Sequence, residues 1–258
     1  MSEHLLEFEH VSLSFKGVKA LRDMTFTVDE GELFAVIGPN GAGKTSTFNC
    51  LNGVYKPQEG DIRWKGKSIL GMRPDMVAEL GVARTFQNIE LFAHMTVIEN
   101  IALGRHVRTN VGWFHGALWW GKAKQEEIAN RAMVEDIIDL LEIEAWRYYP
   151  VGMLPYGIQK RVELGRALAM EPELLLLDEP VAGMNLEETE DMARFILDIR
   201  EELGIAMILV EHDMALVMDI ADRVLVLDFG EVISIGTPDA VQSDPNVIKA
   251  YLGEEMGV

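Results

Sequence analysis

The chain has 258 residues, of which 48% are hydrophobic and 8% aromatic, a composition typical of a soluble globular protein. Its formal net charge of -19 repels nucleic-acid phosphates and anionic lipid headgroups, so direct binding to nucleic acid is disfavoured and a membrane association would run through a protein partner. No apolar stretch approaches the roughly 20 residues that a membrane-spanning helix requires, and the first residues lack a secretory signal, so we expect a cytoplasmic protein.

Alternating apolar and polar residues predict antiparallel strands at the start of the chain. The alternation over 6–15 changes parity part-way, which predicts a strand with a bulge near Glu9 and His10. A second alternating run covers 24–28. Turn-forming residues then lead into a continuous apolar run at 33–37, which is typical of a buried strand.

A glycine-rich segment follows that buried strand directly. Residues 38–45 read Gly-Pro-Asn-Gly-Ala-Gly-Lys-Thr, and residues 45–51 are typical of a helix. Glycines permit the positive φ angles that let backbone N–H groups surround phosphates, and the helix N-terminus adds its dipole. We therefore expect the chain to bind ATP or GTP, with Lys44 on the β- and γ-phosphates and the Thr45 hydroxyl on Mg²⁺. The residues predicted to contact the nucleotide in this segment are Gly38, Pro39, Asn40, Gly41, Ala42, Gly43, Lys44, Thr45 and Ser46.

The rest of the chain alternates between helical and strand patterns. From about residue 72 to 153 the pattern is helical, with one apolar face over 122–143. Continuous apolar runs return at 174–177, 205–210 and 224–227, as in strands that are covered on both faces. Between the first two runs, Asn185 predicts the N-cap of a helix that ends at Gly204.

Strand–helix–strand repetition of this kind predicts an α/β fold with a mainly parallel core sheet, in which the phosphate-binding loop is that of a P-loop NTPase. We expect one compact unit. Residues 1–71 and 154–258 form its nucleotide-binding core, which includes an N-terminal antiparallel β subdomain. Residues 72–153 form a mainly helical subdomain.

Polar residues end two of the predicted strands. Asp178 and Glu179 follow one apolar run, at the carboxyl end of a strand, where open parallel sheets place ligand sites. Asp178 would hold Mg²⁺, directly or through water, and Glu179 would deprotonate the water that attacks the γ-phosphate. His212 ends a second run in the same way, although a lone histidine after a strand is more often an ordinary loop residue.

Taken together, these motifs resemble the ATPase subunits of ATP-binding-cassette (ABC) transporters, and the resemblance covers almost the whole chain. Residues 38–45 resemble the Walker A loop, 84–88 the Q-loop, 154–168 the signature segment, 174–179 the Walker B strand with its catalytic glutamate, and 181–185 the D-loop. The resemblance implies catalytic roles for Lys44, Glu179 and His212, and a metal site formed by Thr45, Gln87 and Asp178. Gln87 would also sense the γ-phosphate of bound ATP.

The resemblance also implies how subunits assemble. Two ATPase subunits would sandwich two ATP molecules head to tail, as a homodimer or a heterodimer, so that a lone chain is catalytically incomplete. They would attach to integral membrane permease subunits on the inner face of the membrane, and act indirectly with an extracytoplasmic substrate-binding protein. ATP binding would close the dimer and hydrolysis would reopen it.

The signature segment departs from the family pattern. Pro155, Tyr156 and Ile158 replace the usual serine, glycine and glutamine, so the signature hydroxyl is missing. Gly157 remains, and its backbone N–H would still face a γ-phosphate. Phe15 occupies the place of an aromatic that stacks on adenine in the family, and we expect it to stack there, although strand alternation also explains it as an inward core residue.

The family resemblance extends to one class of transporter. Residues 84–92, 95–100, 211–214 and 250–254 resemble ATPases of branched-chain amino acid importers. A urea or short-amide importer and a lipopolysaccharide exporter remain alternatives, as does a soluble ABC-type ATPase acting on DNA or ribosomes. A generic P-loop kinase or GTPase would have no use for the signature-like helix. The tryptophan-rich segment 112–121 is either a partner-facing surface or part of the core.

Overall fold

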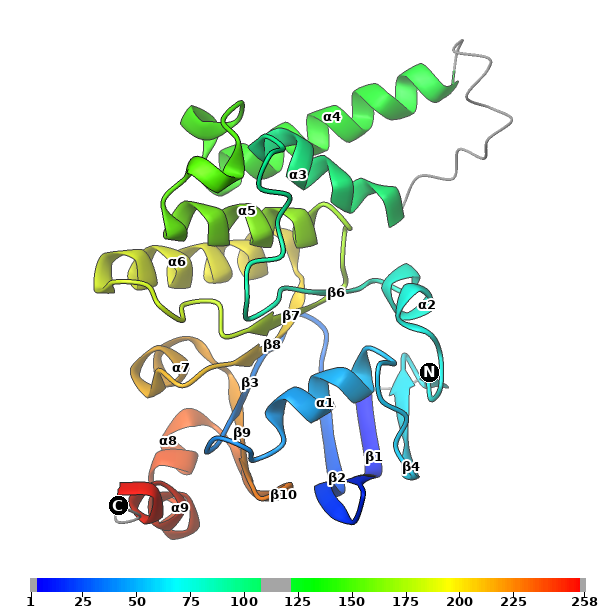
Figure 1. Cartoon of the computed structure of the whole chain (residues 1–258). Coiled ribbons are helices and arrows are strands. Elements are labelled where there is room, and N and C mark those ends of the chain that lie inside the picture. The colour runs from blue at the N-terminus through cyan, green and yellow to red at the C-terminus, as the bar shows by residue number, and fades with distance from the viewer. Residues whose placement is uncertain (1–3, 108–121, 256–258) are drawn as a thin grey trace.

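The computed structural model describes residues 4–107 and 122–255, so the tryptophan-rich segment 112–121 lies outside the described residues. Within them, a six-stranded sheet runs through the middle of the molecule in the order β10-β9-β3-β8-β7-β6 (Figure 1). Its strands are β3 (Leu33–Ile37), β6 (Val82–Arg84), β7 (Leu174–Asp178), β8 (Ala206–Val210), β9 (Arg223–Asp228) and β10 (Glu231–Gly236). All neighbours are parallel except β9 and β10. The prediction of a mainly parallel core sheet is confirmed.

A smaller antiparallel sheet forms from the N-terminal part of the chain. It has the order β2-β1-β4-β5, with β1 (Leu6–Phe15), β2 (Val18–Val28), β4 (Glu59–Trp64) and β5 (Lys67–Ser68). The pairing of β1 with β2 shifts register between Phe8 and Val11, where His10 has a φ of 53°. This irregularity is the predicted bulge, and it lets both parities of β1 face the core.

Helices connect the strands and cover the sheet. They are α1 (Lys44–Leu51), α2 (Pro74–Glu79), α3 (Val97–Gly104), α4 (Lys122–Leu140), α5 (Tyr156–Leu168), α6 (Leu186–Leu203), α7 (Met214–Ile220), α8 (Pro238–Gln242) and α9 (Pro245–Glu255), with short 3₁₀ turns at Arg105–Val107, Glu144–Trp146 and Val151–Met153. Helix α6 begins and ends as predicted. Asn185 and Glu188 form a capping box at its start, and Gly204 adopts a φ of 65° after its last residue.

The central sheet separates two hydrophobic cores, because alternate residues of each buried strand face opposite sides. In β3, Leu33, Ala35 and Ile37 pack with helices α3 to α7, whereas Phe34 and Val36 pack with α1 and the antiparallel sheet. The molecule therefore has three layers (Figure 1). None of the helices in the described ranges is long and apolar enough to cross a membrane.

The division of the chain at residues 72 and 153 stays a prediction. Helices α2, α3 and α4 lie within that range, but so does β6, which forms the edge of the central sheet. A run of three residues has too little periodicity to identify as a strand from sequence. Helix α5 falls outside the range but packs against α3 and α4. Gly165 lies at this contact, and a side chain there would require Ile101 and Leu141 to shift.

Candidate functional site

The site lies along the carboxyl ends of adjacent parallel strands. Val36 of β3 is paired with Val210 of β8, and Val210 is paired with Asp178 of β7, so these strands end side by side. Arg84, the last residue of β6, is paired with Leu176, two residues before Asp178. The loops after β6, β7 and β8 begin with polar residues, the loop after β3 is rich in glycine, and these loops meet at one edge of the sheet.

The phosphate-loop segment 38–45 joins β3 to α1, as predicted. Gly38 and Gly43 have φ angles of 147° and 115°, and an added Cβ would approach the carbonyl oxygens of Leu227 and Ala20 to 2.1 and 2.8 Å. Glycine is therefore required at both positions. The Lys44 ammonium donates to the carbonyl oxygens of Gly38 at 2.5 Å and Pro39 at 3.1 Å, so it lies over the loop.

The first turn of α1 supplies anion-binding capacity. The N–H groups of a first helical turn have no acceptor within the helix, and the positive end of the helix dipole lies beside them. Gly41, in the loop before this turn, has open space on the side where a Cβ would be. This arrangement of a lysine, a helix N-terminus and an open glycine loop fits a polyphosphate.

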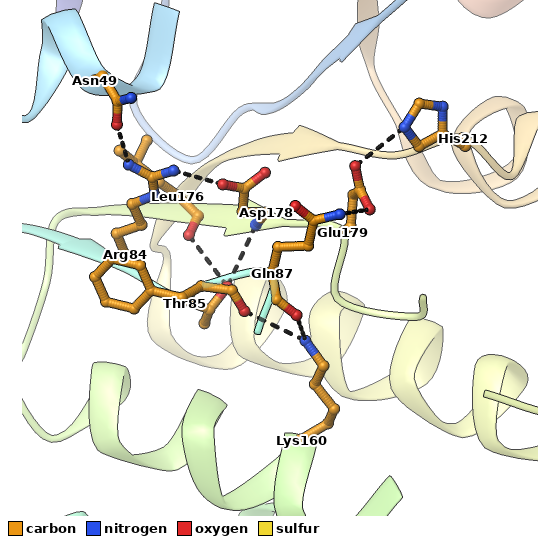
Figure 2. A network of polar contacts seen from close by, with 10 residues as sticks. Asn49, Arg84, Thr85, Gln87, Lys160, Leu176, Asp178, Glu179 and His212 are labelled. Carbon is orange, nitrogen blue, oxygen red and sulfur yellow. Dashed lines mark hydrogen bonds and ion pairs between the residues drawn. The ribbon is translucent and has the colours of Figure 1, made fainter. Parts of the chain in front are cut away.

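Three predicted residues from separate loops are brought together at Glu179 (Figure 2). The Gln87 side-chain amide donates to Glu179 Oε2 at 2.8 Å, and His212 Nε2 lies 3.0 Å from Glu179 Oε1. Glu179 has a φ of 50°, which is unfavourable for a residue with a side chain, and its N–H donates to the carbonyl of Val210. A strained backbone conformation persists only where the surrounding structure holds it, and such residues are concentrated at functional sites.

The buried carboxylate of Asp178 lies next to Glu179, at the end of β7, and forms an ion pair with Arg84. Oxygen atoms such as this carboxylate and the exposed Thr45 hydroxyl are the ligands that Mg²⁺ prefers. In residues 4–107 and 122–255, no cluster of three or more His, Cys, Asp or Glu side chains can hold an ion by itself. The donor set therefore fits a Mg²⁺ ion that takes its other ligands from nucleotide phosphates and water.

Buried charged side chains that were not predicted to act also support the site. Lys160 of α5 donates to the backbone carbonyls of Phe86 and Gln87, at 3.3 and 2.9 Å, and so holds the Q-loop against α5. Glu163, one turn later, lies 3.7 Å from Lys160. Burial raises the pKa of Glu163 despite the neighbouring ammonium. Charged residues at helical spacing of three on an otherwise apolar helix face were the sequence signal for this pair.

Glu211, directly before His212, is a second buried carboxylate that was not assigned a role. It accepts hydrogen bonds from the backbone N–H groups of Val181 at 3.0 Å and His212 at 2.9 Å. Burial raises its pKa, and the charge of Glu179 adds to that increase, while the backbone hydrogen bonds oppose it. Glu211 thus connects the D-loop to the histidine loop within one chain.

Other predicted residues lie apart from this cluster. Phe15 is 43% exposed at the end of β1, and its ring meets the edge of Tyr55 with centroids 4.9 Å apart, so it does not belong to either core. Gly157 is in the first turn of α5, where an added Cβ would lie 2.6 Å from the Glu188 carboxylate. Tyr156 donates its hydroxyl to the carbonyl of Ala182 at 3.2 Å. The unusual signature tyrosine therefore contacts the D-loop.

The similarity of the chain to known proteins identifies its family. The model of the family described as "ABC transporter" matches residues 21–182, more than half of the chain. The chain belongs to the ABC transporter family. A second model, described as "Branched-chain amino acid ATP-binding cassette transporter", matches residues 231–256.

Individual ABC transporter proteins resemble the chain over nearly its full length. The high-affinity branched-chain amino acid transport ATP-binding protein LivG of Escherichia coli strain K12 is 40% identical, covering 98% of this chain and 100% of LivG. BraF of Pseudomonas aeruginosa, which carries the same description, is 38% identical with the same coverage. A solved ATP-binding cassette of an ABC transporter in its ADP conformation has a TM-score of 0.84 at 28% identity, and covers 98% of this chain and 100% of that one. The predicted ABC ATPase fold is therefore confirmed.

Proposed function

We propose that this protein is the ATP-hydrolysing subunit of an importer for branched-chain amino acids. The observation that carries this proposal is the sequence identity to BraF and LivG, which is 38 to 40% over 98% of the chain. The names of both proteins describe such transport. The match of the C-terminal residues 231–256 to a branched-chain amino acid transporter model supports the same substrate class.

In the proposed reaction, the loop amides and the Lys44 ammonium bind the β- and γ-phosphates of ATP. Lys44 exchanges the carbonyls of Gly38 and Pro39 for phosphate oxygens, which are stronger, charged acceptors. Further contacts come from Asn40, Gly41, Ala42, Gly43, Thr45 and Ser46, and Phe15 would stack on the adenine. Mg²⁺, held by Thr45, Asp178 and Gln87 together with the phosphates, would neutralise charge on the transferred group.

Glu179 is the proposed general base. Its carboxylate accepts a proton from the attacking water, and the water oxygen then bonds to the γ-phosphorus as the bond to the leaving ADP oxygen breaks. Gln87 and His212, which contact the two carboxylate oxygens, keep the base oriented and sense the γ-phosphate. Each carboxylate oxygen can accept a second hydrogen bond, so the attacking water can reach Glu179 while these contacts remain.

The assembly we propose contains a second ATPase subunit, identical or different, with the first turn of α5 at Gly157 facing the nucleotide of that subunit. Permease subunits would hold the pair on the inner face of the membrane, and an extracytoplasmic binding protein would deliver the amino acid. The transported substrate does not contact this chain in the proposal.

Uptake by whole cells tests the substrate. Cells that lack the gene should lose uptake of radiolabelled leucine, isoleucine and valine, and the wild-type gene should restore it while the Glu179→Gln variant should not. Loss of urea uptake alone would instead indicate a urea importer. Unchanged uptake of all four compounds, together with a failure to co-purify with membrane proteins, would contradict a role in import.

A further inference from the structure

Arg84 is a largely buried cation at the centre of the site that the proposed reaction does not use. It is the last residue of β6, and its side chain is only 11% exposed. The Q-loop begins directly after it.

The guanidinium is held by hydrogen bonds, which Figure 2 shows to Asn49 and Asp178, and by two aromatic rings. Arg84 Nη1 donates to Asn49 Oδ1 of α1 at 2.8 Å, and the ring centroids of Phe48 and Phe86 lie 5.3 and 5.4 Å from its central carbon. Both distances are within the range of cation–π attraction. The side chain is therefore pinned to the helix that follows the phosphate loop and to the Q-loop at once.

This fixed cation determines the orientation of Asp178. Arg84 Nη2 donates to Asp178 Oδ2 at 2.5 Å, while Oδ1 has no hydrogen-bond partner among the described residues and points away from the guanidinium in Figure 2. The backbone N–H of Asp178 donates to the Thr85 hydroxyl at 3.3 Å, so the residue is held at both ends. A free carboxylate can present either oxygen by rotating about its last bond, but this one cannot without losing a charge-assisted hydrogen bond.

The Nε atom of Arg84 is buried and makes no hydrogen bond in the described part of the chain. An unsatisfied buried donor is unfavourable, and a residue retained only for packing would not need one. Unlike an apolar residue, Arg84 joins two polar groups: Nη1 donates to Asn49 and Nη2 donates to Asp178.

We propose that Arg84 is a positioning residue for the magnesium site: it holds Asp178 Oδ2 so that Oδ1 alone is presented to the ion that accompanies the nucleotide. This inference rests on the proposed function, and it adds a residue that does not itself touch nucleotide or metal. Side chains that orient a metal ligand in this way typically change metal affinity by about 10- to 100-fold when they are replaced.

Binding of ATP to the purified full chain, with and without Mg²⁺, tests the proposal without turnover. Isothermal titration in EDTA and in Mg²⁺ gives the factor by which the metal strengthens ATP binding. The Arg84→Gln variant should lower that factor at least about tenfold. Its ATP affinity in EDTA should stay within about twofold of wild type, because the phosphate loop is intact. Arg84→Lys should restore part of the factor, since it keeps the charge but cannot bond Asn49 and Asp178 together.

Arg223→Gln is the matched control. Arg223 also pairs with a buried glutamate, Glu32, at 3.1 Å and lies over a phenylalanine ring, Phe34, at 5.3 Å, but it does so at the opposite end of the sheet. Its replacement should leave the Mg²⁺ factor unchanged. If Arg84→Gln does not fold by circular dichroism, Asn49→Ala, which frees the guanidinium and keeps its charge, should lower the factor in the same direction.

An unchanged Mg²⁺ factor in folded Arg84→Gln, or in Asn49→Ala if that variant has to replace it, would overturn the proposal. An increased factor would also overturn it, because it would show that the guanidinium competes with the ion for Asp178. If the wild-type chain binds no ATP in either buffer, the proposed function itself fails. The two failures are thus distinguishable.

Discussion

The two ends of the parallel sheet both carry charged side chains, but they use them differently. At the amino end, Glu32 accepts hydrogen bonds from Arg223 and from the backbone N–H of Asp29. Asp222 accepts from the N–H of Leu33 at 2.9 Å through one oxygen, and its other oxygen is also bonded to an arginine. Most of these partners are backbone groups or residues at the starts of strands, so the amino-end contacts fasten turns to the sheet.

At the carboxyl end, the carboxylates of Glu179 and Asp178 have side-chain partners. The Glu179 carboxylate is bonded to the side chains of Gln87 and His212, and Asp178 is bonded to Arg84 through one carboxylate oxygen. The side-chain contacts of Glu179 can be exchanged for contacts to a ligand, whereas a contact that fastens a turn cannot be lost without leaving a backbone group unsatisfied. We therefore interpret the amino end as structural and the carboxyl end as the part that changes with nucleotide. Matched variants at the two ends of the sheet test that contrast.

The largest effect is expected for Glu179→Gln. Loss of the proposed base should lower ATP hydrolysis by the assembled transporter by about 10²- to 10⁴-fold, while ATP binding is kept and a closed dimer accumulates. Phosphate release and gel filtration with ATP measure the two effects. The same isosteric change at the amino end, Asp222→Asn, should leave hydrolysis within about twofold of wild type. Full activity of Glu179→Gln would remove this residue as the base.

A smaller effect is expected for Lys44→Ala. The variant loses charge-assisted hydrogen bonds to the phosphates, each worth about 1.5–3 kcal/mol, so ATP affinity should fall by about 10- to 100-fold in calorimetry. Lys65 is the control, because it forms an ion pair with Glu173 just before β7, at the amino end. Lys65→Ala should leave ATP affinity unchanged. Equal affinity in the wild type and the Lys44→Ala variant would contradict the phosphate site.

Burial raises the pKa of Glu211 at the carboxyl end and of Glu32 at the amino end above 4.5. Between pH 4.5 and its raised pKa, each group is protonated when folded and ionised when unfolded. Each therefore lowers the free energy of unfolding as pH rises through this window, and the cost is absent below pH 4.5. Urea unfolding from pH 4.5 to 8 should show a weaker decline for Glu211→Gln and for Glu32→Gln than for wild type.

Only the carboxyl-end member of this pair should also affect function. Glu211→Gln disturbs the contacts to the D-loop and to His212, so ATP hydrolysis should fall, whereas Glu32→Gln should leave it unchanged. If Glu32→Gln lowered hydrolysis as much as Glu211→Gln does, the contrast between the two ends would be wrong.

The smallest effects concern the two ends of α6. Asn185→Ala removes the N-cap at the carboxyl end, and Gly204→Ala forces a side chain into a φ of 65° next to Gly31, at the amino end. Each should cost about 1 kcal/mol in urea unfolding. Hydrolysis should change only for Asn185→Ala, because the D-loop ends at this cap. An equal change for Gly204→Ala would show that α6 stability alone matters.

Much of this fold was predictable because its signals are local. The apolar run at 33–37, the glycines of 38–45 and the capping box at Asn185 each act within a few residues, so their conformations follow from short-range sterics and hydrogen bonding. The parity change in β1 predicted its bulge for the same reason. The strand β6 was missed because three residues carry too little periodicity.

By itself, the sequence determined the elements, the phosphate loop and the residue types at the ends of the strands, because spacing along the chain is enough to specify them. Only the tertiary structure decided which side chains meet. Gln87 lies 92 residues from Glu179, and Arg84 lies 94 residues from Asp178. These contacts depend on strand order and on the direction of each crossover, which bring distant loops to one edge of the sheet and which local periodicity does not encode.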